Sequence, residues 1–443
     1  MRCVSTRSAL SVRLSDAIAA GLASDGGLFL PEFCPSLSHL SSNFRPDQPL
    51  AQTALQVLTP FFEGDPLAEA LPGICQRAFT FEAPLTWLSQ PPAGETGLLE
   101  LFHGPTAAFK DFAARFLAET LSCLQAKSAS GSASGAVSTV LVATSGDTGA
   151  AVAAAFHRRP GFRVVILYPD GRVSARQAHQ LGAFGENVKC FKVAGSFDDC
   201  QRMVKLAFAD EMLRQTLHLT SANSISLGRL LPQMAYFAHA ALLCQARGLP
   251  PVTCVVPTGN LGNGFACLMA RRAGLPIGEV ILATNANRVI PDYLHTGRYE
   301  PAPSVATLAN AMDVGNPSNA ERLRAWFPDN AGIRGFSVSD AHIRQTIVET
   351  YQQSGVVVCP HTACGVEALR RAREEGLTGP ALVAATAHPA KFETIVEPLL
   401  GITVLPPPAL AQMLARPSAA LPLSASAEAL KEALTGIGRA ASG

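Results

Sequence analysis

The sequence predicts an α/β protein with two parallel-sheet subdomains and an additional N-terminal domain. Short apolar runs of strand length alternate with helix-length segments from about residue 110 onward. Repeated units of this kind are typical of largely parallel sheets that are covered on both faces. The apolar runs fall into two clusters, which indicates two subdomains with a cleft between them. The first 95 residues contain proline and short apolar pieces instead, and they predict a mainly helical domain.

The N-terminal domain, residues 1–95, is marked by a helix cap and a turn. Ser15 is a candidate N-cap for a short helix that follows it. The pair Gly26-Gly27 then predicts a turn into the apolar run Leu28–Leu30. The start of the chain has the arginines and serines of a transit peptide, but the cap and the turn favour folded protein from the first residues.

The core, predicted over residues 96–395, begins with a helix near Lys110, since Phe109, Phe112 and Phe116 recur at helical spacing. This helix is expected to end in a loop of serine and glycine at 128–135. Strands are predicted at 137–143, 163–168, 188–193, 252–256, 280–283, 356–358 and 381–385, and helices at 150–156, from 174 and at 197–208. A smaller α/β subdomain is expected as an insertion at about 136–215, and residues 396–443 are expected to form a C-terminal helical segment.

The composition excludes several classes of protein. Lys and Arg together number 35 and Asp and Glu 34, so the chain has no general attraction to nucleic acid or to an anionic membrane. No apolar run reaches the roughly 18 residues of a membrane helix. The eleven cysteines are scattered without a framework, which favours reduced thiols and a cytoplasmic location. Cys359, His361 and Cys364 lie close together, but their spacing does not match a four-ligand zinc site, and no metal is expected.

The segment His103–Phe112, HGPTAAFKDF, places Lys110 at the start of a predicted helix and between two phenylalanines. Apolar surroundings and the positive end of a helix both disfavour the ammonium form of a lysine. A neutral amine is the form that Schiff-base chemistry requires. A surface lysine that extends its charged end into water is an equally acceptable interpretation of this segment taken alone.

A glycine-rich turn, Pro257–Gly264 with the sequence PTGNLGNG, follows a predicted buried strand and precedes a helix. Its glycines allow backbone N–H groups to converge on an anion at the helix N-terminus. The spacing matches neither a nucleotide-binding P-loop nor a dinucleotide fingerprint. A compact monophosphate is therefore the expected ligand, although any strand-to-helix turn can contain glycines.

Two further turns are suited to anions. The sequence TSGDTG at 144–149 offers hydroxyl and N–H groups, and SANSISLGR at 221–229 adds Arg229, whose planar fork matches phosphate. Each turn taken alone is equally explained as an ordinary helix entry. Together with Lys110 and the glycine-rich turn, they point to pyridoxal phosphate acting on an anionic small-molecule substrate.

These motifs identify a family. The segments HGPTAAFKDF, SGDTG, PTGNLGN and SANSISLGRLLPQ resemble threonine synthase of the fold type II pyridoxal-phosphate enzymes, as do STR, GLASDGGLFLP, NAMDVGNPSN, PHTACG and TAHPAKF elsewhere in the chain. The resemblance implies a carbon–oxygen lyase acting on phosphates, which converts O-phosphohomoserine and water into threonine and phosphate by γ-elimination and β-addition. It also implies a monomer or homodimer without a nucleic-acid or membrane partner.

The resemblance implies a role for each matching residue. Lys110 would carry the cofactor and move protons. The cofactor phosphate would be bound by Gly259, Asn260, Leu261, Gly262 and Asn263, and Thr362 would face the pyridine nitrogen. The substrate carboxylate and the cofactor ring would be lined by Ser145, Gly146, Asp147 and Thr148, and the substrate phosphate would be received by Asn223, Ser224 and Arg229 together with Thr148.

The sequence departs from the family pattern at two positions, and three alternative functions remain. The family often has Asn where Ser226 stands and Asp where Arg288 stands, and the first departure puts the support of Arg229 in question. Threonine dehydratase and O-acetylserine sulfhydrylase have the same fold and cofactor, but their substrates lack the phosphate that Arg229 suits. A family-like protein that binds phosphorylated ligands without catalysis would be expected to lack Lys110.

Overall fold

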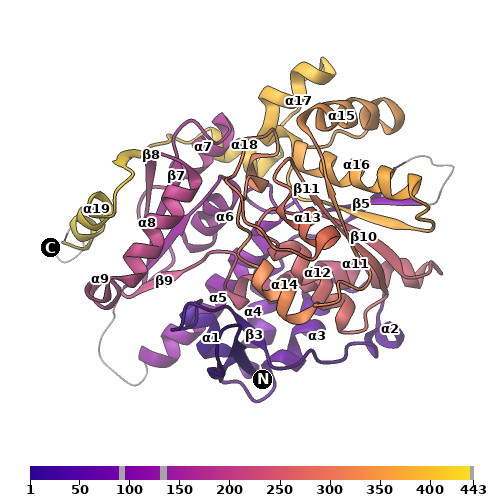
Figure 1. Cartoon of the computed structure of the whole chain (residues 1–443). Coiled ribbons are helices and arrows are strands. Elements are labelled where there is room, and N and C mark those ends of the chain that lie inside the picture. The colour runs from indigo at the N-terminus through magenta and orange to yellow at the C-terminus, as the bar shows by residue number, and fades with distance from the viewer. Residues whose placement is uncertain (89–94, 130–136, 440–443) are drawn as a thin grey trace.

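The structure, a computed structural model, describes residues 1–88, 95–129 and 137–439. It confirms the predicted α/β class. Two separate sheets form the centres of two lobes, and the N-terminal residues pack below them, as Figure 1 shows. The predicted domain boundaries stay a prediction, because a sheet assigns strands to a lobe and does not fix where a domain ends.

The larger sheet has the order β12-β11-β10-β13-β5-β4. Its strands are β4 (Leu85–Trp87), β5 (Thr96–Glu100), β10 (Val252–Pro257), β11 (Ile277–Thr284), β12 (Ile333–Ser337) and β13 (Ala381–Ala385). All neighbours pair in parallel except β4, which is antiparallel to β5. The central strands β10 and β13 are buried along their whole length, because helices cover both faces: α12 (Gly262–Arg272) on one and α16 (Pro360–Glu374) on the other.

The smaller sheet has the order β14-β8-β7-β6-β9, and all of its neighbours are parallel. Its strands are β6 (Ser138–Ala143), β7 (Phe162–Pro169), β8 (Val188–Ala194), β9 (Leu219–Ser221) and β14 (Leu421–Ser424). The edge strand β14 comes from the C-terminal segment, which was predicted to be helical throughout. That segment also contains α18 (Pro408–Leu414) and α19 (Ala427–Arg439), and it wraps from the larger lobe back to the smaller one (Figure 1).

The N-terminal domain contains a sheet that the sequence did not predict. Strands β1 (Arg2–Ser5), β2 (Ser11–Arg13) and β3 (Phe29–Pro31) form an antiparallel sheet of order β2-β1-β3. The helices are α1 (Leu14–Ala20), α2 (Leu40–Asn43), α3 (Leu50–Phe62), η1 (Ala68–Ala70) and α4 (Leu71–Ala78). Ser15 is not the cap of α1, because the helix already begins at Leu14, and the Ser15 backbone N–H donates to the Asp65 carboxylate (2.9 Å).

The other helices are α5 (Lys110–Ala129), α6 (Asp147–Phe156), α7 (Ala175–Gly182), α8 (Phe197–Ala209), α9 (Glu211–Thr216), α10 (Leu227–Leu230), η2 (Leu231–Gln233), α11 (Met234–Ala246), α13 (Val289–Thr296), η3 (Asn310–Met312), α14 (Ala320–Trp326), α15 (Asp340–Ser354), η4 (Pro389–Phe392) and α17 (Glu393–Leu400). The strand predicted at 356–358 is wrong. These valines form a short connection between α15 and α16, and Gly355 in a left-handed conformation ends α15 just before it. The loop predicted at 128–135 lies largely outside the described residues, since α5 extends to Ala129.

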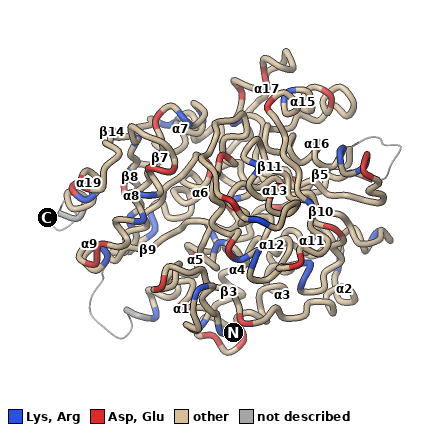
Figure 2. Tube along the Cα trace, viewed as in Figure 1, with Lys and Arg blue, Asp and Glu red and all other residues tan. Residues whose placement is uncertain are grey.

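Basic and acidic residues are interspersed over both lobes, as Figure 2 shows. Among the residues that the structure describes, no helix combines the length and the apolar character needed to cross a membrane.

Candidate active site

The predicted site residues lie just beyond the carboxyl ends of strands, where ligands bind in parallel sheets. The glycine-rich turn follows β10, and Lys110 ends the segment that follows β5. In the other lobe, the TSGDTG turn follows β6, and the segment that leads to Arg229 follows β9. In the smaller sheet β6 and β9 are neighbours, and in the larger sheet β10 and β5 lie on either side of β13. Each sheet therefore brings its own two segments together.

Lys110 begins α5, and its position is fixed by the turn before it. Asp111 accepts hydrogen bonds from the backbone N–H (2.8 Å) and the hydroxyl (2.6 Å) of Thr106. The Phe109 N–H donates to the carbonyl of Thr386 beyond β13 (2.9 Å). The Lys110 side chain is only 13% exposed, and its Nζ lies 5.5 Å from the centre of the Phe109 ring. This burial does not fit the alternative of a surface lysine.

The surroundings of Lys110 favour a neutral amine. Burial lowers the pKa of Lys110 to about 8, and the charges of Lys391 and Arg229 act in the same direction, while Asp147 opposes them. The Asp147 Oδ2 atom lies 3.9 Å from Lys110 Nζ, which is too long for a hydrogen bond. About a tenth of the amine is therefore neutral at pH 7, far more than for an ordinary lysine.

The glycine-rich turn fits a phosphate group. Within the described residues, no acceptor takes a hydrogen bond from the backbone N–H groups of residues 259–264. Leu261, the residue before α12, has a left-handed backbone (φ 62°) and offers no side-chain cap to the helix. The Asn263 Nδ2 atom is also buried without a partner in the described part of the chain. An anion bound here would satisfy these donors, which is what the cofactor phosphate requires.

The glycine-rich turn and the segment before Arg229 are held together. The Asn260 Nδ2 atom donates to the Ser224 hydroxyl (2.6 Å), and the Asn260 carbonyl accepts from Asn319 (2.8 Å). Arg322 in turn donates to the Asn319 side chain (2.6 Å) and to backbone carbonyls of Phe29 and Ile225. Asn260 of the predicted cofactor site and Ser224 of the predicted substrate-phosphate site are therefore in direct contact, and Arg322 links this contact to the N-terminal domain.

Gly259 leaves no room for a side chain. An added Cβ would lie 2.7 Å from the Cα atom of Met312. We expect Gly259→Ala to displace the turn and to weaken pyridoxal-phosphate binding at least about tenfold, or ~1.4 kcal/mol. Titration of apoprotein with the cofactor measures this, and Gly436→Ala, at a position in α19 with open space around it, is the matched control. Equal affinities in the two variants would exclude the turn as the cradle.

The TSGDTG turn is shaped by Thr144, and its Asp147 carboxylate is already paired. The Thr144 hydroxyl accepts from the N–H groups of Gly146 (3.0 Å) and Gly149 (2.9 Å), which shapes the turn. The buried Asp147 carboxylate instead lies 2.7 Å from Lys391 Nζ, and it accepts from Gln177 (2.9 Å). Burial acts to raise the pKa of Asp147, but the ammonium groups of Lys391 and Lys110 hold it well below its usual range. An ionised Asp147 repels a substrate carboxylate, so Ser145 and Thr148 are better placed to receive one than Asp147 or Gly146, whose N–H is already bonded.

Arg229 is a buried cation that has no anionic partner in the described part of the chain. Its side chain is 1% exposed, and burial lowers its pKa to about 10. Its Nη1 atom donates to the Ala222 carbonyl (2.6 Å), while Nε has no partner among the described residues, and no described carboxylate forms an ion pair with it. A buried guanidinium that lacks a counter-ion is unfavourable until an anion binds. Ser226, where the family pattern differs, caps α10 through the Gly228 N–H (3.2 Å) and does not support the guanidinium directly.

Thr362 lies in the first turn of α16. The Cys359 thiol caps this helix by accepting from the Thr362 N–H (3.4 Å), and it also lies 3.2 Å from the Thr362 hydroxyl. The neighbouring His361 accepts from the Ala311 N–H (3.0 Å), and burial lowers its pKa to about 4, so the imidazole is neutral. These contacts give Cys359 and His361 structural roles.

The sequence did not predict the part played by Lys391 and Gln177. Both are buried, and both contact Asp147 from opposite lobes. A signal was present for Lys391, because it stands among Ala, Pro and Phe residues just beyond the predicted strand at 381–385. Nothing in the sequence marks Gln177, which looks like an ordinary position in an exposed helix.

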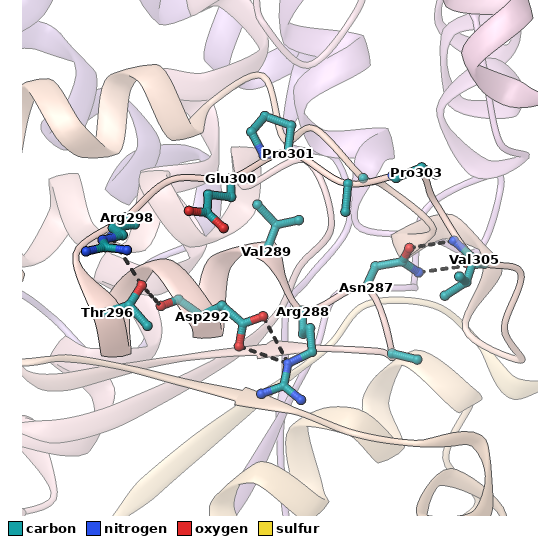
Figure 3. Close-up of a pocket in the computed structure, with 13 residues that line it drawn as sticks. Asn287, Arg288, Val289, Asp292, Thr296, Arg298, Glu300, Pro301, Pro303 and Val305 are labelled. Atoms are coloured by element: carbon teal, nitrogen blue, oxygen red, sulfur yellow. Dashed lines mark hydrogen bonds and ion pairs between the residues drawn. The ribbon is translucent and has the colours of Figure 1, made fainter.

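A pocket of about 740 Å³ lies beside this region, between α13 and residues 298–305 (Figure 3). None of the predicted site residues lines it. Arg288 stands at its edge, where its exposed side chain pairs with Asp292 one turn along the helix (2.8 Å). The second departure from the family pattern is therefore a surface ion pair, of the kind that contributes little to stability.

Three family models match the chain. They are a pyridoxal-phosphate dependent enzyme (residues 89–387), the threonine synthase N terminus (2–79) and the threonine synthase C-terminal region (362–434). The threonine synthase of Haemophilus influenzae is 39% identical over 88% of this chain and 89% of its own, and that of Escherichia coli is 38% identical over 90% and 91%.

Solved structures agree with these relatives. The crystal structure of threonine synthase from Escherichia coli superposes with a TM-score of 0.90 at 36% identity, covering 99% of this chain and 100% of its own. The pyridoxal-phosphate-bound threonine synthase of Brucella melitensis gives 0.87 at 34% identity, with 99% and 100% covered. The chain belongs to the threonine synthase family of pyridoxal-phosphate-dependent enzymes.

Proposed function

We propose that the chain converts O-phospho-L-homoserine and water into L-threonine and phosphate, the last step of threonine biosynthesis. The observation that carries this proposal is Arg229, a buried guanidinium that has a free Nε donor and no anionic partner among the described residues. It lies close enough to lower the pKa of Lys110 by its charge. A second anion site therefore lies near the reactive amine and apart from the glycine-rich turn.

The residues around the glycine-rich turn fit pyridoxal phosphate. We propose that Lys110 holds it covalently, that Gly259, Asn260, Leu261, Gly262 and Asn263 bind its phosphate, and that the Thr362 hydroxyl faces its ring nitrogen. When bound, the cofactor supplies an electron sink for the carbon that loses a proton. The unsatisfied N–H groups at 259–264 support this placement.

The protein's own residues then orient the substrate and move protons. The neutral Lys110 amine removes protons from the substrate Cα and Cβ; protons are returned at Cγ, once the phosphate has left it, and at Cα, and water adds at Cβ. The N–H and hydroxyl groups of Ser145 and Thr148 hold the substrate carboxylate, which Gly146 lines without donating, because its N–H is bonded to the Thr144 hydroxyl. Arg229, with Asn223 and Ser224, holds the phosphate as it leaves from Cγ, where negative charge increases and charge-assisted contacts strengthen.

Relatives with other substrates fit less well. Threonine dehydratase and O-acetylserine sulfhydrylase act on substrates without a terminal phosphate, so a buried and unpaired Arg229 would be unfavourable in their sites. The N-terminal domain holds Arg322, which positions Asn319 and through it the Asn260 carbonyl. A protein that only bound phosphorylated ligands would have no use for a buried lysine with a lowered pKa.

We also propose that the protein is cytoplasmic and that it is a monomer or a homodimer. The cysteines within the described residues are all free thiols, which supports a reducing compartment. The assignment of residues 96–395 to the catalytic core, with an inserted subdomain at about 136–215, is part of the same proposal.

One assay tests the reaction. Purified protein loaded with pyridoxal phosphate is incubated with O-phosphohomoserine, and inorganic phosphate and threonine are measured together. We expect equal amounts of the two products and no activity on O-acetylserine. Phosphate release without threonine, or formation of 2-oxobutyrate in its place, would contradict the proposal.

A further inference from the structure

Lys391 is a second buried lysine in the site. It lies in η4, just beyond β13, and none of its surface is exposed. Its Nζ atom donates to the Thr106 carbonyl (2.9 Å) and lies 2.7 Å from Asp147 Oδ1. Both contacts are short and lie in a buried environment, so the ammonium group is firmly held.

The two lysines face one carboxylate and do not share it equally. Asp147 Oδ1 is 2.7 Å from Lys391 Nζ, whereas Asp147 Oδ2 is 3.9 Å from Lys110 Nζ. Gln177 also donates to Oδ1 (2.9 Å), and this second bond fixes the orientation of the carboxylate. Two buried cations and one anion leave an uncompensated positive charge, and deprotonation of the less well paired amine, Lys110, relieves it.

We propose that Lys391 is a positioning residue, which engages the Asp147 carboxylate at 2.7 Å so that Lys110 pairs with it only weakly, at 3.9 Å, and reacts as a neutral amine. The inference rests on the proposed role of Lys110 and adds a residue that acts through it. In the opposite arrangement, Asp147 would pair with Lys110 and hold it protonated, and the amine could not remove a proton at neutral pH.

Other groups around Lys110 do not provide this effect. The titratable and charged groups that face it are Asp147 from α6, Arg229 from α10, His361 from α16 and Lys391 from η4. His361 is neutral, because burial lowers its pKa to about 4. Arg229 also disfavours the ammonium form of Lys110. Lys391 differs from Arg229 because it both repels Lys110 and holds the carboxylate that would otherwise pair with it.

The contacts that hold η4 against the smaller lobe can be tested separately from the charge of Lys391. The Ser174 hydroxyl donates to the Lys391 carbonyl (2.8 Å), and Arg176 donates to the Ala390 carbonyl (2.5 Å). These bonds run from side chains at the start of α7 in the smaller lobe to backbone carbonyls of η4 in the larger one. Arg176→Met therefore weakens the docking without changing the charge beside Lys110, and it serves as the matched control.

The test measures the amine directly in the apoprotein. Lys110 is labelled with trace acetic anhydride over a range of pH, and the labelled peptide is quantified by mass spectrometry. Because only the neutral amine reacts, wild-type labelling should rise through a midpoint near pH 8, the pKa of Lys110. In Lys391→Met the midpoint should move up by at least about one pH unit, which lowers the rate at pH 7 about tenfold. Lys391→Arg and Arg176→Met should keep the wild-type midpoint.

Two further variants secure the interpretation. Lys391→Gln keeps a donor toward the Thr106 carbonyl and replaces Lys391→Met if that protein does not fold. Asp147→Asn/Lys391→Met removes the whole ion pair, and the Lys110 midpoint should return to the wild-type value or below it. An unchanged midpoint in a folded neutral variant, or an equal shift in Arg176→Met, would overturn the proposal. Threonine formation by the wild-type protein is a separate result, so failure of the reaction assay and failure of this inference are distinguishable.

Discussion

Replacing Lys110 with alanine should lower threonine formation by at least about 10³-fold, since a positioned acid–base group contributes about 10²–10⁴ and this residue also carries the cofactor. In the wild-type protein, borohydride reduction should attach pyridoxal phosphate irreversibly to one lysine. Peptide mapping should find it on Lys110 and not on Lys391, because Lys391 is held as an ammonium group by Asp147 and the Thr106 carbonyl. Absorbance and mapping together measure the attachment without reference to activity.

The matched control is Lys431→Ala, which removes an exposed lysine paired with Asp210 on the smaller lobe. It should leave both cofactor attachment and the rate unchanged. Attachment to Lys391 in the wild-type protein would mean that the two lysines have exchanged the roles assigned to them. The inference about Lys391 as a positioning residue would then fail as well.

The parts of the fold that were predicted correctly have long and strongly patterned sequences. The buried strand β7 and the helix α8 match their predicted ranges to within two residues, because apolar runs and helical spacing continue over at least a whole element. The strands β12 and β14 were missed because both lie at a sheet edge, where partly or fully exposed side chains weaken the apolar pattern. The three valines at 356–358 have strand composition, yet they only connect two helices.

In the site, too, some features were predicted from the sequence and others were not. The turns were found because glycine, hydroxyl and amide residues gather at the ends of predicted strands. Their pairing across the lobes was not predictable, because the sequence does not show that Asp147 faces Lys391 or that Asn260 meets Ser224. Burial of a charge was equally hidden. The sequence marks Arg229 as a candidate anion ligand, but only the three-dimensional arrangement shows that its guanidinium is buried and that no described residue supplies it with an anion.

Removing the Arg229 guanidinium should lower activity on O-phosphohomoserine much more than activity on a substrate without phosphate. Arg229→Ala loses a charge-assisted contact worth ~1.5–3 kcal/mol, so kcat/KM for O-phosphohomoserine should fall about ten- to a hundredfold. Arg229→Lys should recover only part of the loss, because it keeps the charge but not the planar fork. Cofactor absorbance should survive both changes, since the glycine-rich turn binds the cofactor phosphate. A slow side reaction on serine, which has no phosphate, should change little.

A second buried arginine provides the contrast. Arg322 is also fully buried, but its guanidinium donates to the carbonyls of Phe29 and Ile225 and to the Asn319 side chain. Arg322→Met leaves these acceptors unsatisfied, so it should lower the unfolding temperature and weaken turnover of both substrates alike. Arg229 has a free Nε, no counter-ion among the described residues and one carbonyl acceptor, Ala222, so its replacement should cost less stability than that of Arg322 and should discriminate between the substrates. If Arg229→Ala reduced both reactions equally, Arg229 would be structural in the same sense as Arg322, and the phosphate of the substrate would need another binding group.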